Sequence, residues 1–224
     1  MLPQCSGDAV SKANPPLILA STSVYRRALL ERLTVHFTQL APQVIETQNA
    51  AESVEAMALR LAIEKASAVA RLHPGALVIG SDQAATLDGL KAIGKPGQRQ
   101  AAVEQLSQAS GRTMRFYTAL ALIKYHDQPA EQAAGPDFQR AAVVVTEVKF
   151  RDLSPALIAG YLDREPAFDC AGSAKCEGLG IILMASIQSD DPTALIGLPL
   201  IRLTQFLSEA GYELFGVDTA ADGA

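Results

Sequence analysis

Apolar positions along the chain follow two different spacings, which predict strands and helices in alternation. Residues 17–20 (LILA) and 76–80 (ALVIG) are uninterrupted apolar runs, which are typical of buried strands in layered α/β proteins. Residues 35–40 alternate between apolar and polar, as a further short strand would. Residues 53–72 carry apolar side chains at helical spacing and end at His73-Pro74-Gly75, so we predict a helix there.

The remaining apolar positions extend this order of elements to the end of the chain. Helical spacing and capping signals predict four further helices, over residues 23–33, 98–110, 154–162 and 199–210. Strand-like runs occupy three further segments, residues 113–124, 139–150 and 181–184. This order predicts an α/β fold: a mixed sheet with flanking helices, in two lobes around a central cleft.

Length and composition are those of one globular domain. The 224 residues are 49% apolar and 19% charged, and a chain of this size can bury a substantial core. The sequence contains no internal repeat and no long linker. We therefore expect a single domain over residues 17–215, a flexible leader over 1–16 and a flexible tail over 216–224.

Charge, apolar run length and cysteine content exclude several classes of protein. A net charge of −5 argues against a stable nucleic-acid partner, which would require a broad basic face. No apolar run approaches the roughly 18 residues that span a bilayer, so we expect no membrane partner. The three cysteines form no CxxC motif and the three histidines are scattered. We therefore expect neither a disulfide framework nor a zinc site, and a reducing cytoplasm fits best.

A hydroxyl cluster and two arginines follow the first apolar run, where a strand meets a helix. Ser21, Thr22 and Ser23 could simply cap the helix, and an arginine there could face solvent. Arg26 and Arg27, however, add positive charge at the helix end where the dipole is already positive. A bound phosphate would remove this conflict, since backbone N–H and guanidinium groups both bind it. These residues alone leave a simple cap and a phosphate pocket both open.

Four charged residues farther along the chain are candidates for catalysis or phosphate binding. Asp82 follows the second apolar run, where a carboxylate at the lip of a buried sheet could be a general base or metal ligand. A turn aspartate is the alternative. Lys95, on a constrained Gly-Lys-Pro turn, could contact phosphate. Glu46 in a polar loop and Lys65 within a helix are by themselves typical of solvated positions.

The glycine-rich stretch AGSAKCEGLG, residues 171–180, carries one more candidate. It is consistent with a flexible surface loop or with a loop that closes over a ligand. In the second case, Glu177 would accept hydrogen bonds from the edge of a base.

Taken together, these segments resemble one known family. Seven of them occur in the order and spacing of the Maf family, from about Leu17 to Leu207: LILASTSVYRR, IET, EKA, IGSDQ, IGKP, FYTALAL and CAGSAKCEGLGI. Maf proteins are nucleoside triphosphate pyrophosphatases, which cleave between the α- and β-phosphates. The resemblance implies a hydrolase with an ITPase-like fold, a small-molecule nucleotide substrate, a divalent metal cation (Mg²⁺ or Mn²⁺) and a homodimer.

The resemblance also implies a role for each matching residue. Asp82 would be the proton acceptor, and Glu46 with Asp82 would hold the metal ion. The substrate phosphates would be bound by Ser21, Arg27, Lys65 and Lys95, with Arg26 as an additional contact.

Within the family, the chain is most similar to the branch that hydrolyses 7-methyl-GTP, a housecleaning activity on the nucleotide pool. Tyr25, Gln83 and Glu177 stand at the positions that carry this base preference, and an aromatic ring suits a positively charged methylated purine. Val24 replaces the usual proline, Tyr25 a tryptophan, and Ile45 an aspartate, so Ile45 is no metal ligand. The alternatives are a dTTP/UTP pyrophosphatase of the same family and a nucleotide-binding regulator of cell division.

Overall fold

The architecture is one mixed sheet with helices on both faces. The computed structural model describes residues 13–126 and 135–215, so residues 1–12 of the predicted leader and the predicted tail lie outside the described residues. The six-stranded sheet has the order β2-β1-β3-β4-β5-β6. Its strands are β1 (Leu17–Ala20), β2 (Thr38–Leu40), β3 (Leu77–Thr86), β4 (Thr113–Lys124), β5 (Phe138–Phe150) and β6 (Met184–Ser189). The predicted mixed α/β class is confirmed.

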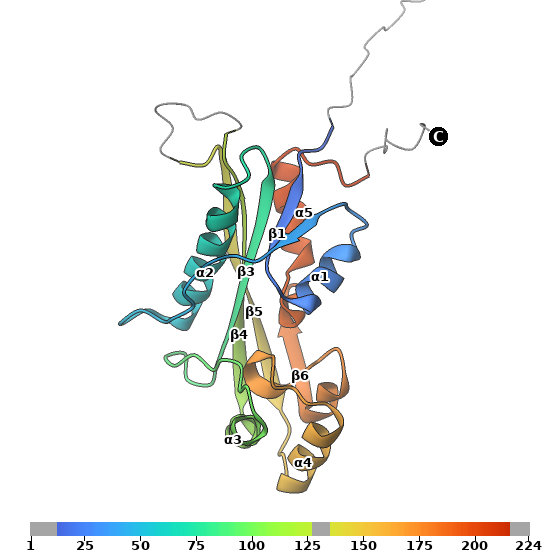
Figure 1. Cartoon of the computed structure of the whole chain (residues 1–224). Coiled ribbons are helices and arrows are strands. Elements are labelled where there is room, and N and C mark those ends of the chain that lie inside the picture. The colour runs from blue at the N-terminus through green and yellow to red at the C-terminus, as the bar shows by residue number, and fades with distance from the viewer. Residues whose placement is uncertain (1–12, 127–134, 216–224) are drawn as a thin grey trace, which may run out of the picture.

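The helices divide between the two faces and one end of the sheet. They are α1 (Val24–Glu31), α2 (Val54–Ala70), α3 (Arg99–Ala109), α4 (Pro155–Arg164) and α5 (Leu200–Glu209), with 3₁₀ turns η1 (Ala171–Ser173), η2 (Leu179–Leu183) and η3 (Ala194–Ile196). Figure 1 shows α2 on one face of the long strands, α1 and α5 on the other, and α3 and α4 gathered at the lower end beside β6.

The alternation of side chains along β3 builds two of the three core clusters. Val78 points to the cluster formed with α2, whereas Leu77 and Ile79 point to the cluster formed with α1 and α5. A third cluster packs α3 and α4 against the far ends of β4 and β5. Each fully buried Leu, Ile or Val contributes about 1.5–3 kcal/mol relative to its exposed state. The middle of β3 is therefore fixed from both sides.

The unequal lengths of β1 and β3 create the opening in which the site lies. β1 runs parallel to β2 and β3 and ends where Ala20 pairs with Gly80. β3 continues to Thr86 with β4 on its other side. The chain leaves β1 for β2 through α1, on one face, and returns to β3 through α2, on the opposite face. A crevice at the carboxyl end of β1 is where open α/β sheets bind ligands.

Three strand predictions were wrong in their limits. The strand predicted over residues 35–40 is shorter, because β2 begins only at Thr38. β3 does not stop at Gly80, so Asp82 lies within the strand rather than at its lip. The polar side chains that suggested an end are satisfied by tertiary partners: Ser81 donates to the carbonyl oxygen of Gly197 at 2.9 Å, and Asp82 accepts from Lys65 at 2.7 Å. The predicted strand 181–184 is mostly 3₁₀, and β6 begins only at Met184.

The contact between β3 and α2 predicts that Gly80→Ala destabilises the protein. A Cβ at this position would collide with the carbonyl oxygen of Ala62 and lie 2.7 Å from the backbone nitrogen of Ala66, neither of which can move without the helix. Overpacking of this kind costs about 1–3 kcal/mol. Chemical denaturation should show that loss in the free energy of unfolding. Gly135→Ala, where no atom lies within 4 Å of the new Cβ, is the control and should show almost none.

Candidate active site

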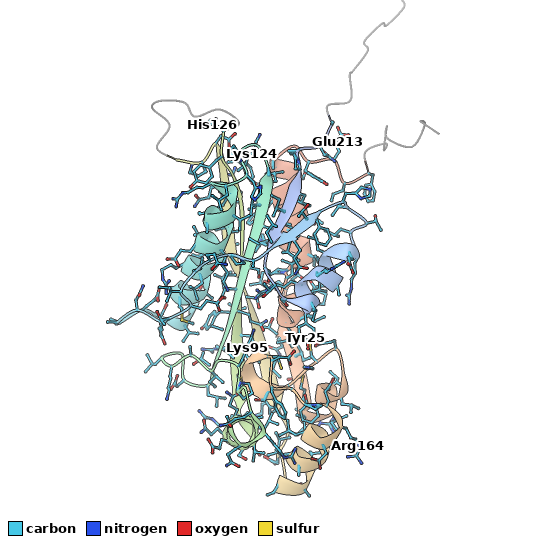
Figure 2. All side chains as sticks on the ribbon, in the orientation of Figure 1. Tyr25, Lys95, Lys124, His126, Arg164 and Glu213 are labelled. Carbon is cyan, nitrogen blue, oxygen red and sulfur yellow. The ribbon has the colours of Figure 1, made fainter. Side chains whose placement is uncertain are left out.

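A cavity of about 580 Å³ opens at the carboxyl end of β1. Segments far apart in the sequence line it: residues 21–26, 82–84, 92–95, 169–171 and 196–197, with Pro42, Glu46 and three side chains of α2, Met57, Leu61 and Lys65. Figure 2 shows Tyr25 and Lys95 at mid-height of the molecule, between the part that carries α1 and α2 and the part that carries α3 and α4. Most of the predicted site residues are among these lining residues.

Two carboxylates share one buried ammonium group inside the cavity. The Nζ of Lys65 lies 2.6 Å from Oε1 of Glu46 and 2.7 Å from Oδ1 of Asp82. Lys65 is only 4% exposed and Asp82 6%, whereas the Glu46 side chain is 57% exposed. A buried lysine stays charged only with such partners. Lys65 is therefore not a solvated helix residue but the bridge between α2, β3 and the loop of Glu46.

Arg26 is held against the same group of charges. Its Nε donates to the carbonyl oxygen of Gly197 at 2.9 Å and its Nη1 to Oγ of Ser21 at 3.3 Å. Burial lowers the pKa of Arg26, and the charges of Asp82 and Glu46 act in the opposite direction. The guanidinium is therefore fixed in place at the wall of the cavity.

The start of α1 also lies at this wall. Ser23 is the N-cap, as predicted, and its Oγ accepts from the backbone nitrogen of Arg26 at 3.3 Å. Ser21 is buried, and its Oγ accepts from the backbone nitrogen of Ser23 at 3.2 Å. The hydroxyl cluster therefore both caps the helix and lines the cavity. A helix N-terminus of this kind favours anions.

Lys95 and Arg27 have opposite placements. Lys95 is exposed, lines the cavity, and has no ion-pair partner in the part of the chain that the structure describes. Arg27 lies outside the cavity lining, and its Nε pairs with Oε1 of Glu31 at 2.9 Å on the outer side of α1. The cavity thus brings together Ser21, Arg26, Lys65 and Lys95 and leaves Arg27 on the surface.

Of the three residues predicted to read the base, Tyr25 and Gln83 line the cavity and Glu177 does not. Gln83 lines the cavity with its Nε2 committed to Thr118 Oγ1 at 2.9 Å and to the carbonyl oxygens of Leu195 and Ala194 at 3.0 and 3.1 Å. Its side-chain oxygen is therefore the group left to accept a hydrogen bond. Glu177 is exposed and is not among the lining residues.

Tyr25 contacts two charged residues, Asp169 and Lys175. Its hydroxyl donates to Oδ2 of Asp169 at 2.7 Å, and the Nζ of Lys175 lies 5.3 Å from its ring centroid. Asp169 belongs to no charge pattern or spacing that would mark it in advance, whereas Lys175 lies in the glycine-rich stretch of residues 171–180 that could close over a ligand. The carbonyl oxygen of Gly197 binds both Arg26 and Ser81. This residue was missed because a backbone acceptor leaves no signal in the sequence.

The donor set restricts how a divalent cation could be held. In residues 13–126 and 135–215, no group of three or more His, Cys, Asp or Glu side chains is arranged to hold a metal ion. Glu46 and Asp82 are nevertheless close, because both contact the same lysine nitrogen. Mg²⁺ is commonly bound by one or two carboxylates together with substrate phosphates. The two residues fit an ion that arrives with a polyphosphate.

Comparison with known proteins agrees with the motifs. Residues 16–210 match the family model described as "Maf-like protein". The chain belongs to the Maf family. This confirms the resemblance read from the seven motifs. None of the helices in the described part of this Maf chain has the length and apolar character that a bilayer crossing requires.

Curated Maf relatives cover almost the whole chain. A protein of Xanthomonas oryzae pv. oryzae (strain MAFF 311018) named "7-methyl-GTP pyrophosphatase" is 56% identical over 89% of this chain and 99% of the relative. A protein of Bordetella avium (strain 197N) with the same name is 54% identical over 89% and 95%. Among solved structures, a HAM1 protein from Coxiella burnetii is 15% identical over 87% of this chain and 99% of that chain, with a TM-score of 0.44, too distant to bear on the fold.

Burial predicts that the two described cysteines of this Maf chain are unreactive. Burial raises the pKa of Cys170 and that of Cys176 to about 12, so both stay thiols at neutral pH. Alkylation at pH 8, followed by peptide mass spectrometry, should be about a hundredfold or more slower than for a free thiol. The rate should keep rising through pH 9 without a plateau. Denaturation should restore fast labelling, whereas fast labelling of the folded chain would contradict the expectation.

Proposed function

We propose that this chain is a pyrophosphatase that hydrolyses 7-methyl-GTP to 7-methyl-GMP and pyrophosphate. The observation that carries the proposal is the meeting of the Glu46–Lys65–Asp82 group with the N-terminus of α1 in one cavity. Such a cavity offers both a base for water and donors for phosphate. The relatives at 56% and 54% identity, both named for this activity, support the same assignment.

Phosphate binding is the part of the activity that the geometry supports in most detail. The backbone N–H groups at the start of α1, Ser21 and the guanidinium of Arg26 form one wall, and Lys95 lies on another. Donors fixed before the reaction stabilise charge that develops on the phosphoryl oxygens, which is the dominant contribution in phosphoryl transfer. Arg26, rather than Arg27, is the arginine in position to act.

Asp82 is the residue that we assign to water activation. One of its carboxylate oxygens is bonded to Lys65, and the other has no hydrogen-bond partner among the described residues. That free oxygen would accept a proton from a water molecule as the water attacks the α-phosphorus. The bond to the oxygen bridging the α- and β-phosphates breaks in the same reaction, and pyrophosphate leaves. Lys65 orients the carboxylate through this ion pair.

A Mg²⁺ or Mn²⁺ ion is part of the proposal, with Glu46 and Asp82 as its protein ligands. When bound, it would neutralise charge on the phosphates and polarise the attacking water. Lys65 contacts both carboxylates, so its ammonium keeps them from repelling each other before the nucleotide arrives.

The base would be read by Tyr25 through stacking and by the free side-chain oxygen of Gln83. Glu177 stays a prediction as a base contact, since its side chain lies outside the cavity lining. A homodimer, which the family resemblance suggests, and a cytoplasmic location, which the cysteine content favours, likewise remain proposals.

Pyrophosphate release from 7-methyl-GTP, GTP, UTP and dTTP, measured with Mg²⁺ or Mn²⁺, tests the proposal. We expect 7-methyl-GTP to give the highest kcat/KM. Asp82→Asn should lower kcat at least about a hundredfold while the circular dichroism spectrum is unchanged, because an amide cannot accept the proton. A preference for UTP or dTTP would assign the chain to the other branch. Tight nucleotide binding without pyrophosphate release would favour a regulatory role.

The two neighbouring arginines give a matched test of phosphate binding. Arg26→Met should lower kcat/KM for 7-methyl-GTP about a hundredfold, as the loss of one fixed donor does. Arg27→Met removes the same charge from the outer side of α1, where the Glu31 pair is exposed, and should change kcat/KM less than about threefold. Thermal unfolding of both variants checks that the fold is retained. Equal losses would remove the distinction between the two residues.

A further inference from the structure

Three side chains at the cavity form a small cation site. The Oδ1 atom of Asp169 lies 2.9 Å from Nζ of Lys175, and its Oδ2 accepts from the Tyr25 hydroxyl at 2.7 Å. The same ammonium lies 5.3 Å from the centroid of the Tyr25 ring. Tyr25 and Asp169 line the cavity, whereas Lys175 does not. A carboxylate and an aromatic ring thus hold one cation between them.

The charges of these groups are well defined. Burial raises the pKa of Tyr25, so its ring is a neutral phenol at neutral pH. Burial also acts to raise the pKa of Asp169, but hydrogen bonds from Lys175 and Tyr25 outweigh it and lower that pKa. The site is therefore an ionised carboxylate beside a neutral aromatic ring, which is the chemistry that attracts organic cations.

We propose that Tyr25 and Asp169 form the cation-recognition site for a positively charged purine base, and that Lys175 occupies this site when no nucleotide is bound. The proposal rests on the proposed function, because methylation at N7 is what gives the guanine base its positive charge. A base that stacks on Tyr25 would take the place of the Lys175 ammonium against both the ring and the carboxylate. The flexible stem of Lys175 allows it to withdraw.

This arrangement makes Lys175 a competitor that acts more strongly against a positively charged base than against a neutral one. A neutral guanine that stacks on Tyr25 displaces the same ammonium, but it is not repelled by the charge of the lysine, whereas a methylated, cationic guanine is. A methylated guanine must exchange with the lysine, so the lysine sets how strongly methylation is rewarded. Asp169, rather than Glu177, is the carboxylate that lines the cavity, although its side chain is 54% exposed and its effect is screened accordingly.

The measured quantity is the ratio of kcat/KM for 7-methyl-GTP to that for GTP. Both substrates carry the same triphosphate, so the ratio removes any effect of a variant on phosphate binding. Asp169→Asn should lower the ratio about threefold to tenfold, and Lys175→Met should raise it about threefold. Lys175→Arg keeps a cation and should restore a ratio near that of the wild type. Lys91→Met removes an exposed lysine charge outside the cavity lining and should leave the ratio unchanged.

A binding measurement separates this proposal from the proposed function. Calorimetry with 7-methyl-GMP and GMP gives a ratio of Kd values that needs no hydrolysis, and it should follow the same order among the variants. If the wild type releases no pyrophosphate, the proposed function fails while the Kd ratios still decide the cation site. If the wild type is active but Asp169→Asn and Lys175→Met both stay within about twofold of its ratios, the cation site is overturned.

Discussion

The ion pair of Lys65 with Asp82 and Glu46 is the interaction on which the rest of the site depends. It joins three elements that approach from different directions, namely a helix, a central strand and a loop. Removing Lys65 would leave Asp82 buried without its partner, and breaking a buried pair in this way typically costs about 3–5 kcal/mol. The Lys65 ammonium could not be buried without these carboxylates, and its contact with Asp82 therefore fixes the distance between α2 and β3. The close approach at Gly80 allows the helix to come near enough for the contact.

A second constraint comes from the early end of β1. A strand that stops beside a longer neighbour leaves polar backbone and side chains at an open edge, where a ligand can reach them. The first turn of α1 begins at this point, and its capping hydroxyls face the same opening. The strand, the start of α1 and the neighbouring loops therefore all place binding groups at the same opening.

Much of this could be predicted from the sequence, and the failures have physical reasons. Apolar runs and helical spacing located β1, α2, β4 and β5, because these elements are set by local pattern and burial. The extension of β3 through Asp82 was missed because the partners that satisfy its polar residues lie far away in the sequence. For the site, residue type and motif order identified Lys65, Asp82 and Lys95 as candidates. Arg27 was expected to be the main phosphate contact and Arg26 an additional one, but Arg26 lines the cavity and Arg27 does not. The sequence could not show this, since neighbouring positions on a helix differ only in the direction they face.

The turn of residues 194–197 has a consequence for how the protein can change during evolution. Its carbonyl oxygens hold Gln83, Thr118, Ser81 and Arg26 at once. Buried Asp191 fixes the turn by accepting from the backbone nitrogens of Thr193 and Ile201. A substitution in this segment would displace the residues proposed to bind the base and those proposed to bind the phosphates together. Its effect would therefore be epistatic with substitutions at either of these two sets of residues. New substrate preferences should arise more easily at cavity residues that do not bond to the turn of residues 194–197.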